Sequence, residues 1–128
     1  MGKRRINQWI APAYQVLITC GIAQDGVVPS TFRSQVSSFA AASIMGGMMA
    51  AAAFFSTQGN ASVRRELLLS AMFCLVSGRY DVVEKPAVVF RYICNNESSE
   101  SHEAFLDAAV ALKLAMNLFD LGKEDGNG

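Results

Sequence analysis

The sequence predicts an all-α fold, a compact bundle of about five to six helices. Three observations carry this prediction. Apolar residues recur at steps of three and four in every long segment, which is the period of a helix face. The chain has 128 residues, which suits one domain. Its composition is 52% hydrophobic and 17% charged, enough to fill a core. We therefore expect a single helical domain over 1–128, with 122–128 as a frayed polar tail.

The first part of the chain predicts a helix, a connector and a second helix. Apolar positions in 6–20 lie on one helical face. Pro12 interrupts this run, and it either kinks the helix or occupies its first turn. A connector follows at Val27–Pro29, after which Ser30 or Thr31 can cap the next helix.

The middle of the chain predicts helices separated by glycines. The Gly46-Gly47 pair weakens one long helix, so two shorter helices are expected to meet there. Asn60 or Ser62 is then expected to cap a helix whose broad apolar face spans 67–75. Gly78 is expected to end that helix.

The last third predicts two more helices. Pro86 suits the first turn of a short helix that ends near residue 94. The run 88–93 would also pass as a strand, but one lone strand would have no partner, so we prefer the helix. The final helix is apolar over most of its circumference, and we expect it to be buried centrally or to meet another subunit. Three serines can cap it: Ser98, Ser99 and Ser101.

The segment Val36–Phe55 is uncharged and long enough to span a bilayer. It consists mostly of Ala, Gly, Ser and Met, which gain little from lipid, so we expect it to pack in a soluble bundle with no membrane partner. Three methionines gather in this segment, and we favour core filling over a partner-binding surface for them. They are Met45, Met48 and Met49.

Charge is distributed unevenly along a chain that is neutral overall. Residues 1–80 contain seven basic and two acidic residues, whereas 81–128 contain four basic and nine acidic ones. This asymmetry predicts either a basic face for an anionic partner and an acidic face for a basic one, or charges that mix on the folded surface.

The sequence contains almost none of the residue patterns used in catalysis. His102 is the single histidine, and we interpret it as a surface residue in a helix's first turn. We expect no catalytic residues, no metal site and no cofactor, because no known catalytic motif or ligand spacing occurs. The odd number of cysteines, without a signal peptide, predicts buried free thiols in a cytoplasmic protein. They are Cys20, Cys74 and Cys94.

Basic residues near the expected helix starts are the better functional candidates. A positive charge there opposes the helix dipole, so local stability does not explain it. Contact with phosphate is one explanation, and ordinary solubility is the other. The candidates for RNA binding are Lys3, Arg4, Arg5, Arg33, Arg64 and Arg65.

Two sequence stretches resemble the small subunit of type III-B CRISPR effector complexes, the Cmr family. The first is Arg5-Ile6-Asn7-Gln8-Trp9 followed by Ala13-Tyr14, which is similar to the family's opening. The second is Gly47-Met48-Met49-Ala50-Ala51-Ala52-Ala53-Phe54, which looks like its Gly-Leu helix. The similarity runs from about Arg4 to Val76.

The resemblance implies a non-catalytic, cytoplasmic subunit of an RNA-guided antiviral complex. Its partners would be the backbone subunit, the large subunit, neighbouring copies of itself, and guide and target RNA. The six basic residues would lie on one face and support RNA binding. Reversing Arg64 and Arg65 to Glu should then weaken RNA binding without lowering stability. Two alternatives remain: a small dimerising or regulatory helical protein that binds no nucleic acid, and a membrane-associated one.

Overall fold

The computed structural model describes residues 2–56 and 64–122. This part of the chain forms six helices and two three-residue strands, which confirms the all-α prediction. In chain order they are α1 (Lys3–Thr19), β1 (Val27–Pro29), α2 (Ser30–Gly46), α3 (Met48–Phe54), α4 (Glu66–Ser77), α5 (Pro86–Asn95), α6 (Ser99–Met116) and β2 (Asp120–Gly122).

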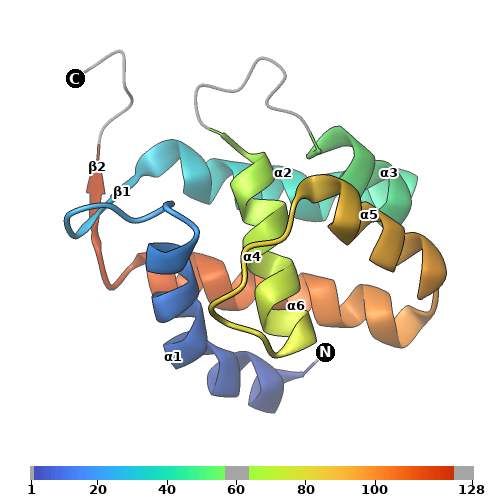
Figure 1. Cartoon of the computed structure of the whole chain (residues 1–128), viewed down its shortest axis with the longest axis horizontal. Coiled ribbons are helices and arrows are strands. Elements are labelled where there is room, and N and C mark those ends of the chain that lie inside the picture. Colours follow the sequence, from blue (N-terminus) through green and yellow to red (C-terminus); the bar gives the residue numbers. More distant parts are fainter. Residues whose placement is uncertain (1, 57–63, 123–128) are drawn as a thin grey trace.

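Helix α6 is the centre of the bundle. It contacts α1, α2 and α4, and α4 passes in front of both α2 and α6 in Figure 1. The buried side chains of α6 include Phe105, Leu112 and Met116, each with essentially no exposed surface. Burying a side chain of this size contributes about 1.5–3 kcal/mol. Central burial therefore explains most of the broad apolar circumference of the last helix, although Leu114 stays exposed.

Aromatic contacts join α2 to α3 in the core. Phe39 of α2 and Phe55, the C-cap residue of α3, are both fully buried. Their rings meet edge to face, with centroids 5.3 Å apart and planes at 81°. This arrangement suits the ring quadrupoles and adds to the energy of burial.

Several predicted helix ends are confirmed. Gly78 ends α4 in the left-handed conformation, with φ 78°. Pro86 occupies the first turn of α5, so the run 88–93 is helical rather than extended. The Ser98 hydroxyl caps α6 by accepting a hydrogen bond from the Ser101 backbone N–H at 3.0 Å.

Other predicted helix starts differ from the structure. Pro12 lies in the interior of α1, not in its first turn. The N-cap position of α2 belongs to Pro29 rather than to Ser30 or Thr31. The N-cap position of α4 belongs to Arg65, and the predicted caps Asn60 and Ser62 lie outside the described residues.

The expected break between two shorter helices falls at Gly47. This residue adopts φ 91° and ψ 165°, a conformation open to glycine and very costly for other residues. Helix α2 ends immediately before it and α3 begins immediately after it. None of the described helices is long and apolar enough to cross a membrane.

The short sheet was not predicted. Strand β1 pairs in parallel with β2, and Val28 lies opposite Leu121 in the register. We expected Val27–Pro29 to be only a connector and Gly122 to belong to a frayed tail. Both segments instead form a ladder at one side of the bundle (Figure 1). The rest of the predicted tail, 123–128, lies outside the described residues.

Candidate nucleic-acid interface

The first turn of α1 presents two exposed cations. Lys3 and Arg4 are both exposed, at the end of the helix where the macrodipole is positive. Within the described residues neither side chain forms an ion pair or a hydrogen bond with another group. These two side chains are therefore available to an anionic ligand.

Arg5, by contrast, is paired with a buried carboxylate. Its Nε and Nη2 donate to Oδ2 of Asp107 at 2.9 and 2.6 Å, and the Asp107 side chain is fully buried. Its guanidinium also lies 5.5 Å from the centroid of the Trp9 ring. Arg5 thus ties α1 to the central helix, and it supplies the charge that a buried carboxylate requires.

Arg64 and Arg65 are adjacent in sequence but have different environments. The Arg64 side chain is 65% exposed and pairs with Glu66, with Nε 3.1 Å from Oε2. Arg65 is only 7% exposed. Its Nη2 donates to the Phe54 carbonyl at 2.9 Å, and its guanidinium carbon lies 3.9 Å from the Phe54 ring centroid. Arg65 therefore joins the end of α3 to the start of α4 and is not part of the exposed basic surface.

Arg33 lies in a groove between α2 and α6. Its Nε is buried and forms no hydrogen bond within the described residues. Lys113 of α6 lines the same groove, and its Nζ donates to the Ser37 hydroxyl at 2.7 Å. The remaining lining is mostly apolar. This groove has no signal in the sequence, because it depends on how far apart two sequence-distant helices pack.

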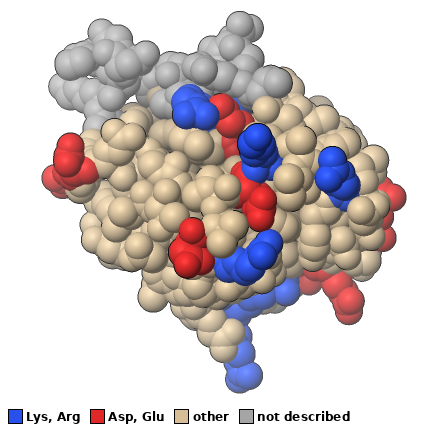
Figure 2. Space-filling view, viewed as in Figure 1, with Lys and Arg blue, Asp and Glu red and all other residues tan. Residues whose placement is uncertain are grey.

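The six predicted residues do not form one cluster. The start of α1 lies at the bottom of the molecule in Figure 1 and the start of α4 at the top. Figure 2 shows positive and negative side chains interspersed over the centre of the same face. Within the described part of the chain, the ion pairs Arg5–Asp107 and Arg79–Glu84 join the basic first part of the sequence to its acidic second part. On this face the charges mix locally rather than separating into a basic and an acidic half.

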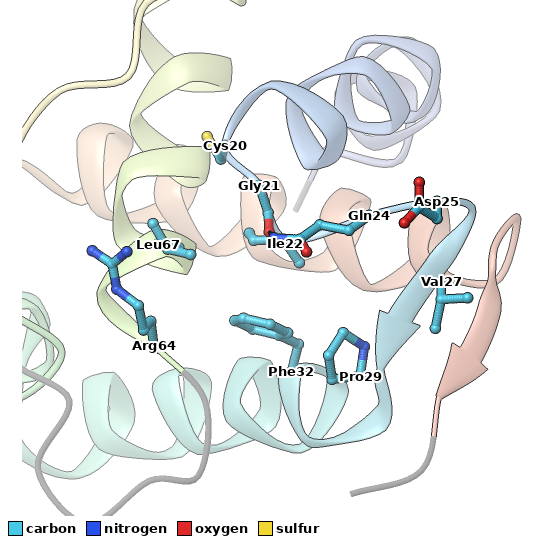
Figure 3. A pocket seen from close by; sticks show the side chains of 10 residues that line it. All are labelled: Cys20, Gly21, Ile22, Gln24, Asp25, Val27, Pro29, Phe32, Arg64 and Leu67. Atoms are coloured by element: carbon cyan, nitrogen blue, oxygen red, sulfur yellow. Dashed lines mark hydrogen bonds between the residues drawn. The ribbon is translucent and has the colours of Figure 1, made fainter. Parts of the chain in front are cut away.

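A pocket of about 510 Å³ lies beside Arg64 (Figure 3). The loop after α1, the start of α2 and the start of α4 form its walls. Arg64 and Asp25 stand on opposite sides, and Phe32 lies between them. Because Phe32 is buried, its ring is not free to stack on a nucleobase. The charged side chains that line this pocket, Arg64 and Asp25, are both exposed and have opposite signs.

Two of the three cysteines interact in the core. Cys20 and Cys74 are buried free thiols, as expected, whereas Cys94 is only partly buried. A hydrogen bond from Cys20 lowers the pKa of the Cys74 thiol, and the same contact, together with burial, raises the pKa of Cys20. Cys74 also donates to the Val82 carbonyl at 3.1 Å. These contacts place both thiols in the packing between α1, α4 and the segment after α4.

His102 lies in the first turn of α6 and is partly buried rather than fully on the surface. Its Nε2 is buried without a hydrogen-bond partner among the described residues. No group of three or more potential metal ligands occurs within 2–56 and 64–122.

Comparison with known proteins does not assign this chain to a family. No family model matches the sequence, and no match was found among curated proteins or solved structures. The resemblance to the Cmr small subunit therefore stays a prediction from the sequence stretches described above.

Proposed function

We propose that this chain is a non-catalytic structural subunit of a Cmr-type CRISPR effector complex, in which it supports guide–target RNA binding. The observation that carries the RNA contact is the pair Lys3 and Arg4. Both are exposed where the helix dipole disfavours positive charge, and neither stabilises the described fold through an ion pair. Arg64, at the rim of its pocket, is a third candidate at a separate place.

The proposal is narrower than the expectation from sequence. Arg5 and Arg65 hold the fold together, so RNA contact is proposed only for exposed cations. Contacts of this kind fix phosphates without reading bases, which suits a subunit that must accept any guide sequence.

The test is binding of the purified chain to a 20-base-pair RNA duplex at two salt concentrations. Because each phosphate contact releases counterions, affinity should fall steeply with salt. The double variant Lys3→Glu/Arg4→Glu should bind more weakly and reduce the logarithmic salt slope by about two, roughly one for each lost contact.

A matched control reverses two exposed cations elsewhere, Lys85→Glu/Arg91→Glu, and changes net charge by the same amount. Equal loss in both double variants would show that only overall charge matters. If the unaltered chain shows no salt-dependent binding to the duplex, the proposed RNA contact is wrong.

A second candidate is assembly without RNA, through apolar surface. Ile44 and Met45 at the end of α2 are 80% and 88% exposed, and Phe54 at the end of α3 is also exposed. The preference for core filling holds for Met48, which is buried, but not for Met45. Ile44 and Met45 are adjacent in the chain, and neighbouring exposed apolar side chains mark interaction sites more often than single ones do.

A further inference from the structure

The groove between α2 and α6 has an apolar end and a cationic end. Val36, Ala40 and Ile44 line it from α2, at the spacing of one helix face. Leu106, Val110 and Leu114 line it from α6. Its volume is about 390 Å³. The two helices run in opposite directions (Figure 1), which places the start of α2 beside the end of α6.

Among residues 2–56 and 64–122, the charged residues that line the groove are two cations, Arg33 and Lys113, and no acidic residue lines it. Arg33 lies near the start of α2 and Lys113 near the end of α6, so both belong to the same end. The buried Arg33 Nε lacks a hydrogen bond within the described residues, and an unpaired donor of this kind is costly. A carboxylate at this end would supply the missing acceptor and complement both charges.

Further exposed apolar residues follow the groove in sequence. Met45 comes after Ile44 at one end and Leu118 after Leu114 at the other, and all four side chains are exposed. The stretch from Arg33 to Ile44 extends over about 16 Å of helix, which matches roughly three turns of a bound helix. A bound helix of three turns would therefore contact the groove from its cationic end to Ile44.

We propose that this groove binds an amphipathic helix of a partner protein. The helix presents apolar side chains at positions i, i+3 or i+4 and i+7 to α2 and α6, and an acidic side chain to Arg33 and Lys113. The proposal rests on the proposed function, in which exposed apolar surface serves assembly with other proteins. It names the partner as an amphipathic helix that carries an acidic side chain. It does not involve Lys3 or Arg4.

The probe is a displayed library of helical 14-residue peptides, selected against the full chain. Enriched peptides should combine the apolar spacing with an acidic residue near one end. Synthesised with a fluorescent label, they should bind at least tenfold more weakly to Arg33→Glu and to Ile44→Ser. A peptide with Lys in place of its acidic residue should regain affinity for Arg33→Glu, because the charges are exchanged.

The controls are Arg91→Glu, an exposed cation of α5, and Ile18→Ser, an exposed apolar residue of α1. Both should bind the peptides as the unaltered chain does. Because Ile44 is largely exposed, Ile44→Ser keeps the fold and remains informative even if Arg33→Glu lowers stability.

Three results would overturn the proposal. These are enrichment without an acidic bias, equal binding by the groove variants and their controls, and a dimer in sedimentation that Ile44→Ser dissociates, since a dimer assigns the groove to a second copy. Peptide binding and RNA binding are separate measurements. Loss of only the first defeats this inference, and loss of only the second defeats the RNA role.

Discussion

Arg65 illustrates how one side chain can link two helices. It combines a charged hydrogen bond to the Phe54 carbonyl with close contact to the Phe54 ring. Removing both in Arg65→Ala should lower the free energy of unfolding by about 2 kcal/mol. Its neighbour Arg64 is exposed, so Arg64→Ala should change stability by less than about 0.5 kcal/mol. Chemical denaturation of the two variants measures the difference, and equal stabilities would show that the Phe54 contacts contribute nothing.

This environment also changes the expected effect of reversing both arginines. A glutamate at position 65 would be buried against the Phe54 carbonyl, which is itself an acceptor. The sequence-based expectation of unchanged stability assumed that both side chains are exposed, and Arg65 is buried. We therefore expect the Arg64/Arg65 double variant to lose stability, and Arg64→Glu alone is the useful test of RNA contact.

The Arg5–Asp107 pair should contribute more than an exposed ion pair does. In Arg5→Ala the fully buried Asp107 carboxylate loses both hydrogen bonds that it accepts from Arg5. Breaking a buried pair in this way costs 3–5 kcal/mol, and since Arg5 is about one-third exposed we expect roughly 3 kcal/mol. The control is Arg4→Ala, whose side chain is exposed. Thermal or chemical unfolding tests this, and a destabilisation no larger than that of the control would contradict it.

At the scale of elements, the junction between α2 and α3 depends on glycine. Gly47→Asn should lower stability by about 1–3 kcal/mol, because φ 91° with ψ 165° is a region that only glycine occupies readily. Gly78→Asn is the matched comparison, because Gly78 is left-handed at a helix end and asparagine tolerates that conformation. Unfolding measurements should therefore separate the two variants, and equal losses would show that the Gly47 conformation is not required.

The elements that could be predicted from sequence are those with local signals. Pro86, Ser98 and Gly78 mark helix ends through their own backbone or side-chain chemistry, and the structure confirms each of them. The β1–β2 ladder had no local signal. Three-residue strands carry almost no periodicity, and the pairing of Val28 with Leu121 depends on how the intervening helices pack.

Across the whole molecule, the sequence does not predict which charged side chains are paired in the fold and which stay exposed. The sequence indicated which residues are cations but not which of them the fold uses. Arg5 is paired across 102 positions in the chain, and no local pattern predicts such a partner. Arg5 lies on the side of α1 that faces the central helix, whereas its neighbours Lys3 and Arg4 are exposed. For the same reason, the α2–α6 groove appears only once the bundle is assembled.

The β1–β2 ladder also predicts an order of folding, in which the strands pair after the helices have packed. It joins Val27–Pro29 to Asp120–Gly122, which are 93 positions apart in the sequence, through strands of three residues each. Such contacts form late, because the entropy of closing the loop must be overcome before they contribute. The ladder is short and parallel, and it pairs segments that the helices have already brought together. The amides of the ladder should accordingly exchange hydrogen faster than those of α6. The sheet would then be the last element to form on folding and the first to open on unfolding.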